Sequence, residues 1–193
     1  MPAPERMPRF TPDDLDDEQR ALYDAIASGP RATGPQHFPL THADGSLAGP
    51  FNALLVQPAL GTAVQELGAA IRYRTSLSPR VRELAILMVA SSWNSVFERF
   101  AHEAVGRAAG LSEREIADMR MGLLPQLSDP VELASLRAVR ALITGDIDDE
   151  LWTRLREHLD ERTIFELSTL VGYYALLALQ LRAFRADTVP VSA

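Results

Sequence analysis

Cysteine is absent from this 193-residue chain. Disulfides, thiolate metal sites, redox dithiols and cysteine nucleophiles are therefore excluded. Any function that needs sulfur to cycle between thiol and disulfide is excluded with them.

Clusters of basic residues and long apolar runs are lacking too. The net charge of −7 and the pI of about 5.1 disfavour binding to nucleic acid or to an anionic membrane. The long uncharged stretch 167–181 is shorter than the roughly 20 apolar residues of a membrane span, so we expect it to be buried. Residues 1–9 lack the apolar stretch of a signal peptide, and we expect a cytoplasmic protein with no membrane partner.

Sustained alternation of apolar and polar residues, which is typical of β-strands, is also missing, so the fold is predicted to be all-α. Caps, prolines and glycines predict a short helix after Pro50 and longer helices over about residues 16–28, 58–74, 79–92, 95–109, 112–120, 130–144, 148–159 and 162–186. We expect residues 1–48 to form an arm, a first helix and a long loop. Residues 49–193 are expected to form the helical domain.

One internal similarity links two of the predicted helices. The segment RVRELAILMVASSW, around Glu83, resembles RTIFELSTLVGYYA, around Glu166. Each has an arginine, then Glu-Leu, then an apolar run. Two antiparallel helical hairpins related by duplication are one interpretation, and chance similarity between two apolar helices is the other.

The candidate site lies in the middle of the chain. Ser95, Glu98 and His102 are three and four residues apart, which places them in one stripe of a helix. If this helix and the preceding one form an antiparallel hairpin that turns near Trp93, Glu83 comes close to His102. A carboxylate beside the apolar run of the first helix needs such a partner, because an unpaired buried charge is costly.

Two carboxylates around one imidazole make a plausible general acid–base centre, since histidine titrates near neutral pH. Each residue also has a structural interpretation. Ser95 and Glu98 fit a capping box, Glu98 and His102 fit an exposed ion pair, and Glu83 could pair with Arg80 or Arg82. The residues alone leave these alternatives open.

The segment 49–119 resembles the carboxymuconolactone decarboxylase family, which belongs to the same superfamily as alkylhydroperoxidase D (AhpD). The resemblance rests on an ordered set of motifs: Arg82-Glu83-Leu84, Trp93, Phe97-Glu98, Ala101-His102-Glu103 and Ala109-Gly110-Leu111-Ser112. It implies an AhpD-like helical bundle that assembles as a homo-oligomer, commonly a trimer or hexamer.

The resemblance also implies a catalytic branch. Alkylhydroperoxidase D has a Glu, a Cys-x-x-Cys pair and a His at fixed spacing. Here Glu83 and His102 match, whereas Ser95 and Glu98 stand in place of the cysteines. The chain is therefore similar to the decarboxylase-type branch, which uses acid–base groups and no cofactor.

We accordingly expect a carbon–carbon lyase that acts on a small carboxylated or lactone-like molecule. His102, Glu98 and Glu83 are the expected catalytic residues, and Trp93, Ser95, Arg99 and Phe51 the expected substrate contacts. Isomerisation and hydrolysis would use the same groups. Three alternatives remain: a non-catalytic binding or assembly protein, a residual peroxidase, and a metal site formed by Glu83, Glu98 and His102, to which His37 or His42 could add ligands from the long loop.

Overall fold

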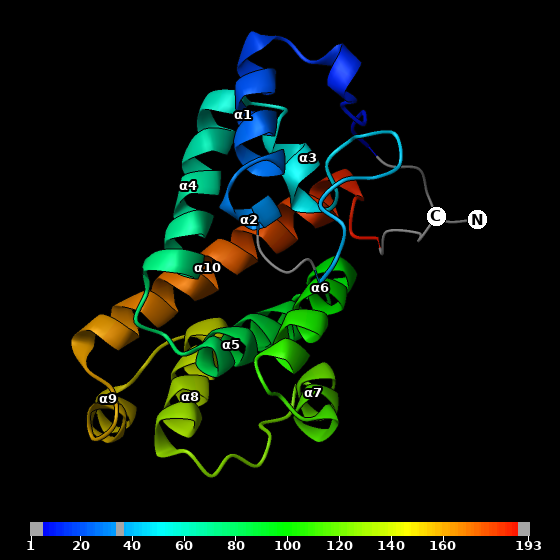
Figure 1. Cartoon of the computed structure of the whole chain (residues 1–193). Helices are drawn as coiled ribbons and strands as arrows, with labels where there is room; N and C mark the ends of the chain where they lie inside the picture. The colour runs from blue at the N-terminus through cyan, green and yellow to red at the C-terminus, as the bar shows by residue number, and fades with distance from the viewer. Residues whose placement is uncertain (1–5, 34–36, 189–193) are drawn as a thin grey trace.

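The computed structural model describes residues 6–33 and 37–188, and across these two ranges the backbone forms helices and no β-strand. The elements in chain order are the 3-10 helix η1 (Pro12–Asp14), α1 (Asp17–Ala27), α2 (Pro30–Thr33), α3 (Pro50–Leu54), α4 (Pro58–Arg74), α5 (Pro79–Ser92), α6 (Val96–Ala108), α7 (Glu113–Arg120), α8 (Pro130–Thr144), α9 (Asp149–Arg156) and α10 (Glu161–Phe184) (Figure 1). The predicted all-α fold is confirmed.

Most helices begin where the sequence supplies a cap. Asp16 forms a capping box with Gln19, and Ser112 forms one with Glu115. Two boundaries differ from the prediction. Pro30 starts the short α2 inside the expected loop, and α9 ends at Arg156 because the chain turns before Asp160 caps α10.

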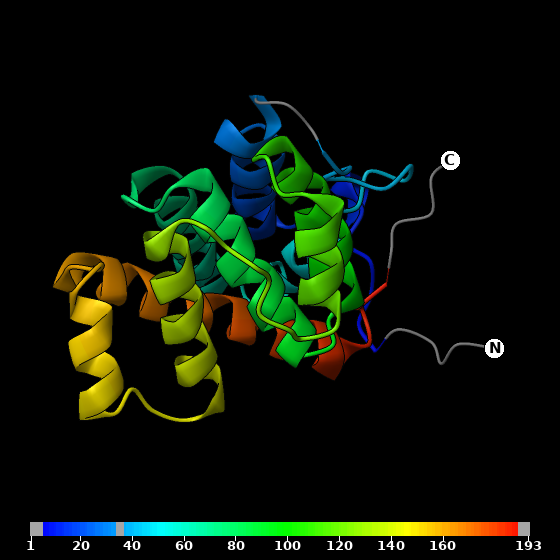
Figure 2. The same ribbon diagram turned by 90° about the horizontal axis from the view of Figure 1, so that it is seen from below.

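The helix α5 is the centre of the molecule. It packs against α6, α7, α8 and α10, and its residues Leu84, Ala85 and Val89 have no exposed surface. The near-continuous apolar run of α5 is explained by these neighbours, which cover it on most sides. At one end of the molecule α8 and α9 lie side by side, as Figure 2 shows.

The long helix α10 crosses the fold and packs against α3, α4, α5 and α8. In the part of the chain that the structure describes, it is the one helix long and apolar enough to cross a membrane by length and composition. Leu167, Leu170 and Leu181 are fully buried within the protein, however. One face of α10 therefore packs into the core of the protein.

The N-terminal elements pack onto the same core. Leu22 and Ile26 of α1 lie in the hydrophobic cluster that contains α5 and α10, and α1 runs beside α4. The preceding arm is held by Asn52, whose Oδ1 accepts from the Phe10 amide at 3.1 Å and whose Nδ2 donates to the Pro8 carbonyl at 3.1 Å. The division of the chain at residue 48 stays a prediction.

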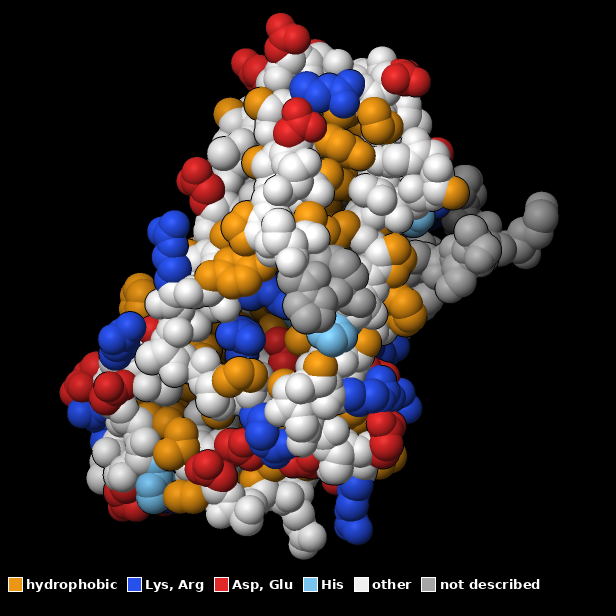
Figure 3. Space-filling model, in the orientation of Figure 1, with side chains coloured by type: hydrophobic (Ala, Val, Ile, Leu, Met, Phe, Trp, Pro, Cys, Tyr) orange, Lys and Arg blue, Asp and Glu red, His pale blue; other side chains and the backbone are white. Residues whose placement is uncertain are grey.

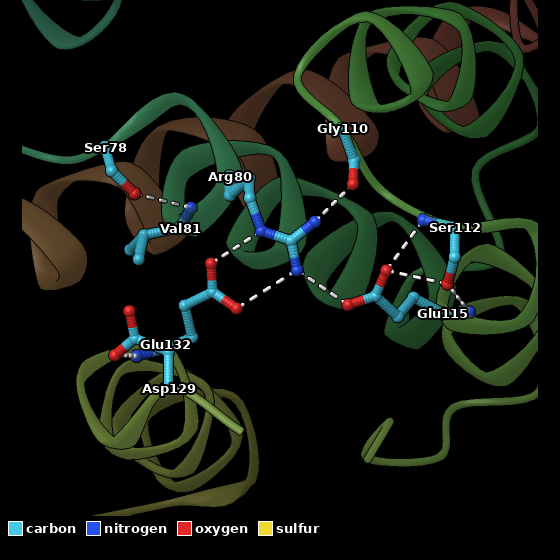
Figure 4. Close-up of polar contacts among 8 residues, drawn as sticks. All are labelled: Ser78, Arg80, Val81, Gly110, Ser112, Glu115, Asp129 and Glu132. Atoms are coloured by element: carbon cyan, nitrogen blue, oxygen red, sulfur yellow. Dashed lines mark hydrogen bonds and ion pairs between the residues drawn. The ribbon is translucent and has the colours of Figure 1, made fainter. Parts of the chain in front are cut away.

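Arg80, at the start of α5, ties three helices together (Figure 4). Its Nε donates to Glu132 of α8 at 2.6 Å, its Nη2 donates to Glu115 of α7 at 2.6 Å, and its Nη1 donates to the Gly110 carbonyl. These charge-assisted bonds raise the pKa of the guanidinium above its ordinary value. Arg80 therefore joins helices and does not pair with Glu83, whose partners are His102 and Arg82.

Candidate active site

The turn between α5 and α6 builds the site. Asn94 adopts a left-handed conformation (φ 51°), which asparagine tolerates better than most residues, and the Ser95 amide donates to the Ala90 carbonyl at 2.8 Å. Ser95 then caps α6 by accepting from the Glu98 amide. The two helices consequently run antiparallel, as the sequence predicted.

This hairpin brings Glu83, Glu98 and His102 together. His102 Nδ1 lies 2.7 Å from Glu83 Oε2, and His102 Nε2 lies 3.4 Å from Glu98 Oε2. The exposed fractions of the three residues are 0%, 3% and 6% respectively. An imidazole is thus held between two carboxylates inside the protein, and the alternative of an exposed Glu98–His102 pair is wrong.

Glu83 is the ionised partner of the imidazole. Burial alone would raise the pKa of Glu83, but the His102 charge and hydrogen bond, with help from Arg82 and Arg72, hold that pKa below its ordinary value. Arg82 Nε also lies 3.4 Å from Glu83 Oε1. Because the Glu83 carboxylate accepts this hydrogen bond, His102 carries a proton on Nδ1. The other ring nitrogen, Nε2, faces Glu98.

Glu98 behaves in the opposite way. Burial raises its pKa from 4.5 to about 7, and the charge of Asp187 adds to the effect, while His102 and Arg31 oppose it. Its Oε1 is buried and has no hydrogen-bond partner among the described residues. Leaving a carboxylate oxygen unpartnered is costly, so such groups call for a functional explanation. Two carboxylates with pKa values shifted in opposite directions are a common arrangement for acid–base work.

Two tyrosines of α10 complete the surroundings of the imidazole. The Tyr174 ring meets the His102 ring edge to face at 5.2 Å, and Tyr173 meets Tyr174 in the same way at 5.3 Å. Burial raises the pKa of Tyr173 to about 12 and that of Tyr174 well above its ordinary value. Both hydroxyls therefore remain protonated at neutral pH and can serve as hydrogen-bond donors.

A small cavity adjoins Glu98 and His102. Its volume is about 30 Å³, room for a water molecule or two. The walls combine two arginines with aromatic and aliphatic side chains: Arg31, Arg72, Phe38, Phe51, Phe97, Tyr173, Tyr174, Pro50, Ala101 and Leu177. Near the middle of the face in Figure 3 the surface is hollowed, and basic and acidic side chains meet there.

The sequence model of the carboxymuconolactone decarboxylase family matches residues 58–141, which include the whole α5–α6 hairpin. The match covers 84 of the 193 residues, so this part of the chain is similar to that family. No curated protein matches the chain significantly.

Solved structures show the same fold at low sequence identity. A protein from Ralstonia eutropha, described as an uncharacterized peroxidase-related protein with an alkylhydroperoxidase AhpD core, aligns with a TM-score of 0.75 at 15% identity over 96% of this chain and 92% of its own. An Agrobacterium tumefaciens protein of unknown function, described as a candidate AhpD antioxidant defence protein, gives 0.64 at 23% identity over 73% of this chain and 97% of its own.

A third neighbour has a different described activity. The debrominase Bmp8, solved as a cysteine-to-alanine variant with 2,3,4-tribromopyrrole, aligns with a TM-score of 0.68 at 11% identity over 95% of this chain and 90% of its own. All three neighbours therefore share the AhpD-like fold with this chain. Similarity at this level shows the fold alone.

Of the four predicted substrate contacts, Phe51 alone lines the cavity. Trp93 instead stacks under Arg182 at 5.2 Å, and Arg99 donates to Asn94 at 2.8 Å. Ser95 uses its hydroxyl in capping α6 and in a bond to Asp187. The structure gives Trp93, Ser95 and Arg99 these partners, and their role as substrate contacts stays a prediction.

His37 and His42, the loop histidines that were open as extra metal ligands, do not line the cavity. His37 is exposed, and His42 lies in a turn where its amide donates to the Ser46 carbonyl at 2.8 Å. Within residues 6–33 and 37–188, no group of three or more His, Asp or Glu side chains could hold a metal ion.

Sequence reasoning missed Arg31, Tyr173, Tyr174 and Asp187. The first three line the cavity from α2 and α10. Asp187 accepts from the Ser95 hydroxyl and from the Phe97 amide. They lie tens of residues from the α5–α6 motifs, and nothing in their local spacing signals the contact. The Tyr-Tyr pair within the apolar run of α10 is the one available hint.

Proposed function

We propose that this protein is a cofactor-independent acid–base enzyme, a carbon–carbon lyase that acts on a small carboxylated or lactone-like molecule. The observation that carries the proposal is the buried Glu83–His102–Glu98 array beside a cavity. Within it Glu98 has a pKa of about 7 and an unpartnered oxygen. A group that titrates near neutral pH and has a free hydrogen-bonding position can exchange a proton with a ligand.

The three side chains have distinct roles in this proposal. Glu83 is a positioning residue that fixes the tautomer and orientation of the imidazole through Nδ1. His102 Nε2 and Glu98 Oε2, 3.4 Å apart, share the proton that is delivered to the substrate. Tyr174 limits the rotation of the ring by packing against it.

In a decarboxylation, the bond between the carboxylate carbon and the adjacent carbon breaks and CO2 leaves. The electron pair moves into a conjugated carbonyl and forms an enolate. His102, with Glu98, then protonates the enolate at carbon and regains a proton from water. No oxidant or reductant is consumed. Isomerisation would use the same proton transfers without loss of CO2.

Two of the neighbours are described as AhpD-like or peroxidase-related, which suggests one competing function. Peroxide reduction in the manner of a dithiol enzyme requires cysteines, and this chain has none. A binding protein without catalysis would use the same fold, but nothing in such a role would favour a buried carboxylate with an unpartnered oxygen.

The direct test is CO2 release from carboxymuconolactone, the compound named in the family description, together with a panel of small unsaturated lactones and β-keto acids. We expect His102→Gln and Glu98→Gln to lower kcat at least 100-fold. The matched control is His158→Gln, because His158 is exposed and lies far from the hairpin. Equal rates for His102→Gln and the parent protein, or consumption of cumene hydroperoxide without added thiols or metals, would refute the proposal.

We also propose a cytoplasmic homo-oligomer, a trimer or hexamer. Support comes from large apolar side chains that remain exposed on α4 and α10, including Leu60 (62%), Phe165 (71%) and Leu179 (48%). Exposed apolar surface of this kind is typical of interfaces. A monomeric mass by light scattering at micromolar concentration would contradict this part of the proposal.

A further inference from the structure

Two arginines reach the cavity from helices outside the α5–α6 hairpin. Arg31 lies on α2, where its Nε donates to Gln65 Oε1 at 3.3 Å and its guanidinium lies 5.2 Å from the centre of the Phe51 ring. Arg72 lies in the last turn of α4. Both side chains line the cavity that Glu98 and His102 also line.

The two guanidinium groups act on different members of the catalytic array. The charge of Arg31 lowers the pKa of Glu98, and the charge of Arg72 lowers the pKa of Glu83. Among the described residues the Arg72 guanidinium forms no ion pair with a carboxylate, and it lies 5.9 Å from the centre of the Tyr73 ring. A cation that lines an enclosed space without an ion-pair partner is suited to an anionic ligand.

The charges around the cavity also favour an anion. Glu83 is already paired with His102 and lies 3.4 Å from Arg82. Glu98 has a pKa of about 7 and carries only part of a negative charge at neutral pH. The paired Glu83 and the partly protonated Glu98 therefore leave little negative charge at the cavity to oppose an anionic ligand.

We propose that Arg31 and Arg72 bind the carboxylate of a flat, unsaturated substrate beside His102. Phe38, Phe51 and Phe97 supply the apolar walls, and flat aromatic walls favour a planar ligand. The assignment rests on the proposed function for the reaction that follows binding, but the binding step itself can be measured separately.

The present volume of about 30 Å³ is too small for such a ligand. Its entry requires wall side chains to move. Arg31 belongs to a helix of four residues, Pro30–Thr33, and Phe38 lies outside the helices, so these two walls are held by fewer helical hydrogen bonds than the walls from α6 and α10. Arg31 would move with the ligand's carboxylate, while Arg72 would remain anchored on α4.

The test uses 2-furoate, a planar five-membered oxygen ring with a carboxylate, and its neutral counterpart 2-furamide. Isothermal titration calorimetry of the full-length protein gives both affinities. We expect 2-furoate to bind at least tenfold more tightly than 2-furamide. Arg31→Gln and Arg72→Gln should each lower the affinity for 2-furoate at least fivefold and leave the affinity for 2-furamide unchanged.

Arg74→Gln is the matched control, because Arg74 is exposed two residues further along the same helix and does not line the cavity. It should change the 2-furoate affinity less than twofold. Arg72→Gln should disturb the fold little, because Arg82 donates to the backbone carbonyl of residue 72 and this bond is kept in the variant. Thermal unfolding of the Arg31 variant checks that its fold is retained.

Three outcomes overturn the assignment: no binding of 2-furoate at millimolar concentration, equal affinity for 2-furoate and 2-furamide, or unchanged 2-furoate affinity in both arginine variants. The proposed lyase reaction is tested separately from the binding site. A protein that binds 2-furoate through the two arginines but releases no CO2 from any compound of the panel retains the binding site and loses the lyase function.

Discussion

Asp187 and Ser95 meet at the N-terminus of α6, where the Ser95 hydroxyl donates to Asp187 Oδ1 at 2.9 Å. The same carboxylate accepts the backbone amides of Val96 at 3.0 Å and Phe97 at 2.8 Å. A residue after the last helix thus fixes the start of the helix that carries Glu98 and His102. Its negative charge also favours the helix N-terminus and disfavours ionisation of Glu98.

We predict that Asp187→Asn lowers the pKa of Glu98 from its value of about 7. The amide keeps one oxygen to accept from α6 but removes the charge that opposes ionisation. Carboxyl carbon NMR across a pH titration measures the change. Ser95→Ala is the control, because it removes one hydrogen bond and leaves the Asp187 charge in place. A Glu98 pKa that is the same in Asp187→Asn and the parent would contradict this account.

Glu98→Gln should stabilise the protein at pH 8 by about 3 kcal/mol. The pKa of Glu98 is raised from 4.5 to about 7, so the native state holds its proton where the unfolded chain has lost it. Stability therefore falls as the pH rises from about 4.5 to about 7, and the amide avoids this loss. Denaturant unfolding at pH 4 and pH 8 checks the sign: the gain should be small at pH 4. A variant less stable than the parent at pH 8 would show that ionised Glu98 has a partner.

The same substitution at Glu83 should have the opposite effect. The pKa of Glu83 is lowered, so its contribution to stability is present above its ordinary pKa and is lost as the pH falls through the lowered value. Glu83→Gln leaves His102 and Arg82 without a buried counter-charge, which costs about 3 kcal/mol at pH 7. Unfolding curves of the two glutamine variants in parallel provide the comparison. Equal effects at both positions would mean that the two carboxylates share one environment.

Arg80→Gln should destabilise the protein by about 2 kcal/mol, because it removes the charged bonds that join α5 to α7 and α8. Catalysis and 2-furoate binding should persist in the fraction that remains folded, since Arg80 does not line the cavity. Arg154→Gln is the comparison: its ion pair with Glu150 is exposed at 54% and 80% and should be worth less than about 1 kcal/mol. Similar melting temperatures for the two variants would argue against the role of Arg80.

The helical fold and the α5–α6 hairpin could be predicted because their signals are local. Ser78 caps α5 and Pro79 begins it, and the apolar run of α5 indicates that this helix is buried. Asn94 then allows the left-handed turn that leads to the cap at Ser95. The regular geometry of helices then brings residues at equal distances from that turn together, which is why the contact between Glu83 and His102 followed from the sequence.

Other parts of the site depended on contacts between distant segments. Arg31, Tyr174 and Asp187 reach the array from α2, from α10 and from the segment after α10. The choice between an exposed Glu98–His102 pair and a buried one was also open in the sequence. Burial is set by which helices cover α6, and the pKa of a carboxylate follows its burial.

The sequence by itself determined the helices, the hairpin and the absence of sulfur chemistry, because caps, apolar periodicity and residue type act within a few positions of the chain. Only the tertiary structure decided that Glu98 lies in a desolvated position with an unpartnered oxygen, and that two arginines share its cavity. The desolvation of a group and the charges that act on it depend on all the segments packed around it, and a local sequence pattern does not contain this information.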